Sequence, residues 1–202
     1  MARADVTTRA DTASRILDCA ESLVQMRGFN GFSYADVASE LAVTTASLHY
    51  HFPGKAELGR ALITRYAARF DAALATIDAA GRSAPAKLEA YVQLYADVLR
   101  AHRMCLCGML AAEYQTLPEP MRDAVLGFFG TNESWVEGVL AGGRDDGTLA
   151  FAGDARDAAQ QIVSALEGAM LVARPFGDVE RFETAGRRLL AGFSVAPAAQ
   201  PR

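Results

Sequence analysis

Residues 33–57 hold the side chains of this chain that are best suited to binding a nucleic acid, most of them within residues 44–55. The segment reads Thr-Thr-Ala-Ser-Leu-His-Tyr-His-Phe-Pro-Gly-Lys, so hydroxyl, imidazole and ammonium groups are mixed with small residues. Hydroxyl and ammonium groups bind phosphate oxygens, and small side chains on a helix let it approach base edges in a major groove. The pattern therefore favours non-covalent recognition of double-stranded DNA. The candidate contacts are Ser33, Thr44, Thr45, Ala46, Ser47, His49, Tyr50 and Lys55.

Two short helices joined by a tight turn must present these side chains. Ser33 can cap the first helix, and Asp36 three residues later completes a capping box. Thr44 can cap the second helix, which a proline ends. Leu48 and Phe52 are four residues apart and share the face that packs inward, which leaves the polar residues outside. The spacing predicts a helix-turn-helix.

The segment Leu48–Lys55 resembles the end of the recognition helix in the TetR family of bacterial transcriptional regulators. That family has Leu-Tyr-Tyr-His-Phe, a short turn and a lysine here, and His49 replaces one of its aromatic residues. Ile16–Ala20 and Arg27–Phe29 also match the family's first helix and its glycine exit. The specific resemblance covers roughly residues 12–66.

The resemblance implies a role for individual residues of the second helix. Some would contact phosphates and position the protein, while others would face base edges. The role of His49 stays open between phosphate, base and solvent. An ordinary helical hairpin with His and Tyr on its surface is the alternative to the whole interpretation. The implied phosphate contacts are Thr44, Tyr50 and Lys55, the implied base-edge contacts are Thr45 and Ala46, and Ser47 and His49 are further candidates.

Length and composition exclude several classes of protein. The 202 residues are 51% hydrophobic, which is enough for a substantial core. No apolar run approaches the about 18 residues that a membrane span needs, and the N-terminus lacks the apolar core of a signal peptide. A cytoplasmic protein without a membrane partner is expected. Because no phosphate-binding glycine loop, nucleophile elbow or paired metal motif occurs, we predict no enzyme activity, metal site or cofactor.

The charge of the chain restricts how it can bind DNA. The net charge is −4 at pH 7, and residues 1–60 hold six basic residues against seven acidic ones. Binding must therefore depend on the local placement of basic residues, with acids such as Glu21 turned away from the phosphates. A dimer would double the number of phosphate contacts.

The helical periodicity predicts an all-α chain of about nine helices. A polar stretch at residues 1–11 would be mobile, with Arg3 and Arg9 able to reach a minor groove. The next helix should pack across the hairpin and complete a three-helix head, and a long helix should follow at about 54–80. The predicted organisation is a DNA-binding domain at 1–53, a ligand-binding and dimerisation domain at 54–194 and a disordered tail at 195–202.

The larger predicted domain should hold a sensor for a small-molecule effector. Aromatic and apolar residues between 88 and 135 could enclose a mostly apolar cavity with a few polar groups, which is the usual composition of a ligand site. Plain core packing is the alternative for each of them. The candidate ligand-binding residues are Tyr91, Tyr95, His102, Cys107, Leu110, Glu113, Tyr114, Phe128, Trp135 and Gln161.

The last two helices carry a face of small residues, including Ala165, Gly168 and Ala169. Such a face fits either a homodimer interface of four helices or an intramolecular core, and the family resemblance favours the dimer.

Cys105 and Cys107 are candidates for a redox role. If both are helical they point about 200° apart, so one should face inward and the other outward. The surrounding segment is similar to a NemR-like branch of the family in which a cysteine senses electrophiles, although Met104 stands where that branch often has glycine. An inert buried thiol is the alternative.

Together the residues and the resemblance predict a TetR-type transcriptional regulator, acting as a repressor that a small-molecule effector releases from a palindromic operator. The alternative is a helical sensor or carrier of small or thiol-reactive molecules with no DNA-binding role. Salt-sensitive binding to duplex DNA distinguishes the two.

Overall fold

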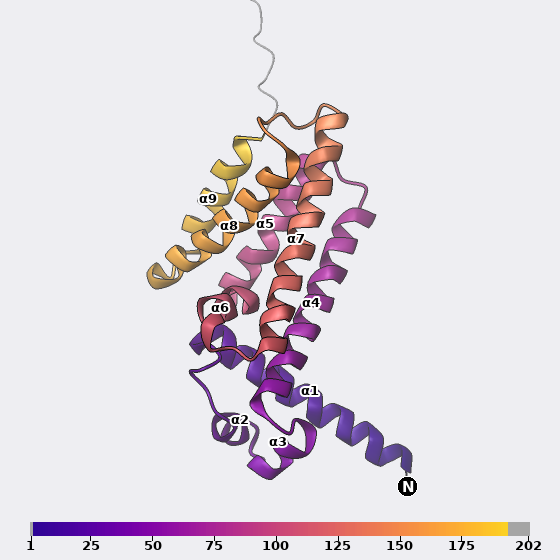
Figure 1. The fold of residues 1–202 in the computed structure, drawn as a ribbon, viewed down its shortest axis with the longest axis vertical. Coiled ribbons are helices and arrows are strands. Elements are labelled where there is room, and N and C mark those ends of the chain that lie inside the picture. Colours follow the sequence, from indigo (N-terminus) through magenta and orange to yellow (C-terminus); the bar gives the residue numbers. More distant parts are fainter. Residues whose placement is uncertain (1, 194–202) are drawn as a thin grey trace, which may run out of the picture. The chain divides into compact units, whose positions relative to one another are not determined.

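The computed structural model describes residues 2–193, and within that range the chain is all-α with nine α-helices (Figure 1). The predicted fold class is confirmed. Two short 3-10 turns accompany the helices. The elements are α1 Ala2–Arg27, α2 Tyr34–Leu41, α3 Thr45–His51, α4 Lys55–Ala79, α5 Ala84–Arg100, α6 Leu106–Ala112, η1 Tyr114–Thr116, α7 Glu119–Asp145, α8 Ala155–Ala173, η2 Arg174–Phe176 and α9 Val179–Ala191.

The chain groups into two compact units, each made of two segments. Unit 1 contains the residues up to Arg69 together with Arg103–Phe128, and unit 2 contains Phe70–His102 together with the residues from Phe129 onward. The long helices α4 and α7 each contribute to both units. The predicted boundary at residue 53, between the DNA-binding domain and the ligand-binding domain, stays a prediction. The expected tail at 195–202 lies outside the described residues.

Unit 1 contains the helix-turn-helix, whose ends form as the local sequence predicts. The hydroxyl of Ser33 accepts from the amide of Asp36, and the Asp36 carboxylate accepts from the amide of Ser33 at 2.6 Å. The Asp36 carboxylate also accepts from the Ser33 hydroxyl, and this bond and the one from the Ser33 amide lower the pKa of Asp36. Ala42 adopts a left-handed conformation with φ of 53° and makes the turn, after which Thr44 caps α3. The core of this region consists of Ile16, Ala20, Val24, Val37, Leu48, Leu58 and Leu62.

Unit 2 is built around the packing of α9 on α5 and α8 (Figure 1). Gly186 of α9 permits this close approach, because a Cβ atom at that position would lie 2.7 Å from Cγ1 of Val92 on α5. Asp154 and Asp178 accept from backbone amides at the starts of α8 and α9, respectively. The largest fully buried side chains here are Leu88, Tyr91, Tyr95 and Phe182.

The first helix differs from its prediction at the N-terminus. It begins at Ala2 rather than near residue 12, so the backbone of the stretch that was expected to be mobile is helical. No glycine or proline precedes Gly28, so no helix-breaking residue prevents the helix from extending to the N-terminal stretch. The side chains of the first ten residues lie outside the description, so the minor-groove role of Arg3 and Arg9 stays a prediction.

In the described part of the chain, no helix combines the length and the apolar character that crossing a bilayer requires.

Candidate nucleic-acid interface and effector region

Helix α3 presents a polar face to solvent and an apolar face to the core. Thr45, Ala46 and Tyr50 are exposed, with 63% of Tyr50 accessible, whereas Leu48 is completely buried. The hydroxyl of Thr44 accepts from the amide of Ser47 at 3.2 Å and so fixes the first turn of the helix. This is the arrangement that was predicted for a helix entering a major groove, and the individual contacts stay predictions.

Lys55 binds the loop between α1 and α2, and the phosphate contact that the family resemblance implies for it stays a prediction. Its ammonium donates to the carbonyl oxygens of Phe29 and Phe32, each at 2.5 Å. It also lies over both rings, 4.6 Å and 4.4 Å from their centroids. Burial lowers the pKa of Lys55, while the negative charges of Glu113 and Asp36 raise it. Two of its three donors thus support the loop between α1 and α2, and sequence patterns gave no sign of those partners.

His49 is held by its neighbours rather than projecting freely. Its Nδ1 lies 3.1 Å from the carbonyl oxygen of Pro53, and its ring packs 4.7 Å from the ring of Tyr34. Tyr34 in turn donates from its hydroxyl to the carbonyl of Phe52 at 2.9 Å. Burial, with a contribution from Glu57, raises the pKa of Tyr34 to about 12, so this donor keeps its proton at neutral pH. His49 therefore stabilises the end of α3, whatever it contacts on DNA.

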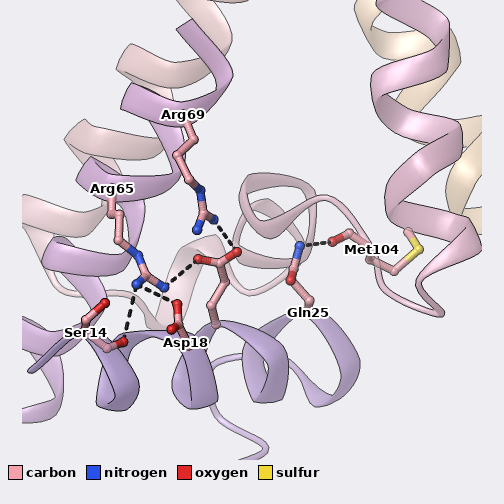
Figure 2. Close-up of polar contacts among 7 residues, drawn as sticks. Ser14, Asp18, Gln25, Arg65, Arg69 and Met104 are labelled. Atoms are coloured by element: carbon pink, nitrogen blue, oxygen red, sulfur yellow. Dashed lines mark hydrogen bonds and ion pairs between the residues drawn. The ribbon is translucent and has the colours of Figure 1, made fainter. Parts of the chain in front are cut away.

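Helix α1 is attached to α4 by ion pairs that the sequence analysis missed. Figure 2 shows Arg65 and Arg69 reaching from α4 toward α1. Arg65 pairs with Asp18 at 2.8 Å and with Glu21 at 3.0 Å, and Arg69 also pairs with Glu21. Glu21 is only 6% exposed, so this acid is turned into the protein as expected for a DNA binder. Ser14, Asp18, Glu21 and Gln25 recur at helical spacing, and that polar stripe was the available signal.

In unit 2, three of the candidate ligand-binding residues, Tyr91, Tyr95 and Trp135, form a polar and aromatic cluster with Phe70 and Asn132. The hydroxyl of Tyr91 lies 3.0 Å from that of Tyr95 and donates to Oδ1 of Asn132 at 3.1 Å. The Trp135 ring stacks on Tyr91 with centroids 5.5 Å apart. The ring of Phe70 meets the Tyr91 and Tyr95 rings edge-on, at 6.1 Å and 5.9 Å. Asn132 was not predicted, because one amide in an apolar helix face carries little sequence signal.

Two predicted ligand contacts lie elsewhere. His102 is exposed just after α5, with a positive φ of 57°, and Gln161 is exposed on α8. Both side chains face solvent in this chain, apart from the aromatic cluster. Their role in ligand binding stays a prediction.

The remaining predicted ligand contacts belong to unit 1. Cys107 and Leu110 are buried in α6, and Phe128 packs on Tyr66 with centroids 5.6 Å apart. Tyr114 lies beneath the guanidinium of Arg122. The carboxylate of Glu113 accepts from the backbone amides of Phe29 and Asn30, so its partners belong to the α1–α2 loop. Their place in an effector site stays a prediction.

The two neighbouring cysteines are both buried, which corrects the expectation that one faces outward. Cys105 is 1% exposed and Cys107 is inaccessible. The reason is that Cys105 precedes α6 instead of lying within it: its backbone is non-helical, and its sulfur accepts from the amide of Gly108 at 3.4 Å. Cys19 is half-buried, and burial, with a smaller contribution from Glu40, raises the pKa of its thiol.

This burial predicts an order of reactivity among the thiols. In the folded protein Cys19 should be alkylated first, and Cys105 and Cys107 should react at least about tenfold more slowly because reagent cannot reach them. Iodoacetamide labelling followed by peptide mass spectrometry, with and without guanidinium, measures the three rates. Native labelling of Cys105 as fast as that of Cys19 would contradict this order and favour a thiol sensor.

The short capped hairpin, its exposed second helix and the helical remainder define a helix-turn-helix DNA-binding protein with a separate helical C-terminal region. The chain belongs to the tetR family of bacterial regulatory proteins. The model of the family's DNA-binding part matches residues 16–62, and that of the tetracyclin repressor-like C-terminal domain matches residues 84–189. The predicted class, a DNA-binding transcriptional regulator of this family, is confirmed. The family is regulatory rather than enzymatic.

Individual relatives agree with this assignment. The HTH-type transcriptional repressor NemR of Escherichia coli K12 is 27% identical over 189 residues, covering 88% of this chain and 92% of the relative. A TetR-family regulator of Agrobacterium tumefaciens has a crystal structure with a TM-score of 0.90 and 32% identity, covering 93% of this chain and all of that one. The reduced form of E. coli NemR gives a TM-score of 0.80 at 26% identity, with coverage of 93% and 100%. The expected similarity to the NemR branch is confirmed.

Proposed function

We propose that this regulator is a repressor that binds a palindromic operator as a homodimer and is released by a small-molecule effector. The observation that carries the proposal is the exposed face of α3, where Thr45, Ala46 and Tyr50 stand on a helix fixed at both ends by Thr44 and His49. A rigid helix with small and hydroxyl-bearing residues outside suits direct contact with base edges. The NemR relative is named a repressor, which supports repression rather than activation by this protein.

Homodimerisation would use the outer faces of α8 and α9. Ala165 and Gly168 are exposed on α8, and a Cβ atom at Gly168 would meet nothing within 4 Å. Leu171 at the end of α8 and Phe176 in η2 are 59% and 62% exposed, so this face carries large apolar side chains in contact with solvent. Two copies of such a face can pack closely in an isologous four-helix interface.

This interface predicts the effect of a charge placed in it. Gly168→Glu should convert the dimer into a monomer, because it buries two charges in a small-residue contact, and operator affinity should fall with it. Light scattering after size-exclusion chromatography measures the mass. Gly130→Glu on α7 is the matched control, since Gly130 is also exposed, helical and open around its Cβ position. A dimeric Gly168→Glu protein would refute this interface.

The effector site would be built on the Tyr91, Tyr95 and Asn132 cluster of unit 2. These three side chains are fully or almost fully buried, and they present two hydroxyls and an amide among aromatic rings. Such surroundings suit a small, mostly apolar molecule with one or two hydrogen-bonding groups. Binding would have to separate the rings or replace the bond between Tyr91 and Asn132.

Helix α4 offers a covalent route from that cluster to the DNA-binding head. Phe70 packs on Tyr91 and Tyr95, and the preceding residue, Arg69, pairs with the buried Glu21 of α1. A ligand that displaces Phe70 would therefore act on the adjacent Arg69 contact. The effector shifts the equilibrium only by its difference in affinity between the two arrangements.

Selection of bound genomic fragments by the purified protein tests the function. Wild type should enrich a pseudo-palindromic sequence, and Tyr50→Ala should lose it, because Tyr50 is exposed and carries none of the core. Lys55 is a poor choice for the control, since its removal would disturb the loop beneath it. No enrichment by wild type would favour the carrier without a DNA-binding role, and equal enrichment by wild type and variant would refute the role of Tyr50.

A further inference from the structure

We infer that Glu113 is a positioning residue that ties the segment around α6 to the DNA-binding head and holds the head in its operator-binding arrangement. The inference deepens the proposed function and rests on it. Three observations in unit 1 carry it: the partners of the Glu113 carboxylate, the space left for it by a glycine, and a second attachment at the other end of α6.

The Glu113 carboxylate lies in a cradle of backbone amides at the end of α1. Oε2 accepts from the amide of Phe29 at 2.5 Å, and Oε1 accepts from the amide of Asn30 at 3.2 Å. Successive amides that point at one anion form a small nest for negative charge. Here the chain's own carboxylate, 84 residues further along from Phe29, fills the nest.

Gly28 makes the approach possible. Its φ is +84°, which disfavours other residues, and a Cβ atom there would lie 2.8 Å from Oε1 of Glu113. The glycine that ends α1 thus serves a purpose besides helix termination. Asparagine at position 28 could also end the helix, but its Cβ atom would prevent the Glu113 carboxylate from lying at this distance.

The loop between α1 and α2, to which Glu113 is bound, leads directly into the helix-turn-helix and so determines its position. Asn30 donates from its side chain to the hydroxyl of Thr116 at 2.7 Å, and Lys55 binds two carbonyls of the same loop from α4. Ser33, the N-cap of α2, follows Asn30 by only three residues. Groups on α4, α6 and η1 therefore converge on the loop that places α2 and α3.

The segment before α6 is attached to α1 as well. Gln25 donates from Nε2 to the carbonyl of Met104 at 2.9 Å, and the amide of Met104 donates to the carbonyl of Gln25 at 3.3 Å (Figure 2). Gln25 is 3% exposed, so this reciprocal pair is shielded from water. The α6 segment is thus hydrogen-bonded at both ends: Met104 at its start contacts the last turn of α1, and Glu113 at its end contacts the loop that follows α1. Movement of α6 would thus be transmitted to the head.

The test compares Glu113→Gln with Glu119→Gln, an exposed glutamate in the first turn of α7. Removing the charge should speed amide hydrogen exchange at Phe29 and Asn30 by about tenfold or more, because hydrogen bonds to a charged group are the stronger ones. Affinity for the selected operator should fall about tenfold, while the dimer and the thermal midpoint change little. Gly28→Ala, which crowds the same carboxylate, should act in the same direction.

Hydrogen exchange measured with and without operator DNA distinguishes a positioning role of Glu113 from a purely structural role. Operator DNA should slow exchange at Phe29 and Asn30 further in wild type and in Glu119→Gln, but not in Glu113→Gln. Unchanged exchange in free Glu113→Gln would overturn the tie itself. Faster exchange with operator affinity within twofold of wild type would overturn the positioning role. Failure of the proposed function appears separately, as wild-type protein that selects no DNA although its Glu113 tie protects the two amides.

Discussion

Ala46→Asp should lower operator affinity by about a hundredfold or more, because a carboxylate would then face phosphates and base edges, and like charges at an interface cost several kcal/mol. The fold should not suffer. Ala46 is exposed in the first turn of α3, where a negative charge interacts favourably with the helix dipole. The variant thus separates DNA binding from stability.

Fluorescence anisotropy with a labelled operator, at two or more salt concentrations, measures this loss. Ala75→Asp is the matched control, since it adds the same charge at an exposed position of α4 in unit 2. It should keep affinity within about twofold to threefold, because screening weakens a charge beyond roughly 10 Å at 0.1 M salt. Equal losses in the two variants would mean that net charge, not the face of α3, governs binding.

Glu21→Ala should destabilise the protein by about 2–3 kcal/mol. Removing one partner of a buried ion pair leaves the other charge uncompensated, which typically costs about 3–5 kcal/mol. The lower figure applies because Arg65 keeps its contact with Asp18 and because 51% of the Arg69 side chain is exposed. Operator affinity should fall too, since α1 would lose two of its ion pairs with α4.

Urea unfolding and thermal melting measure this effect, with an expected drop in Tm of about 6 °C or more for a chain of this size. Asp18→Ala supplies the comparison, because Asp18 pairs with the same Arg65 but is 66% exposed, and exposed pairs contribute only about 0–1 kcal/mol. If Glu21→Ala cost no more than Asp18→Ala, the buried pairs would not hold α1 on α4.

The parts of the structure that depend on neighbouring residues could be predicted from the sequence. Ser33 with Asp36, and Thr44 with Ser47, cap their helices as expected, because a cap joins groups only three residues apart. The inward face of α3 also follows from local spacing, since Leu48 is buried. The helix-turn-helix is therefore predictable without knowledge of the rest of the fold.

The parts that depend on distant partners could not be predicted. Lys55 and Glu113 serve the α1–α2 loop, whose residues lie 23 to 84 positions away. No periodicity in the sequence connects such positions, and a lysine after a recognition helix suggests a phosphate contact instead. The exposure of His102 and Gln161 could not be predicted for a related reason, because it depends on which distant neighbours pack beside them.

The adjacency of Arg69 and Phe70 makes α4 sensitive to the insertion or deletion of a residue. The helix runs from Lys55 to Ala79 without a proline, so no hinge inside it can absorb an inserted or deleted residue. One extra residue after Arg69 would turn the contacts that follow by about 100° against those that precede. Each added residue also moves the following contacts by about 1.5 Å along the helix axis. A single-residue insertion after Arg69 is therefore expected to break either the Arg69 contact or the Phe70 contact.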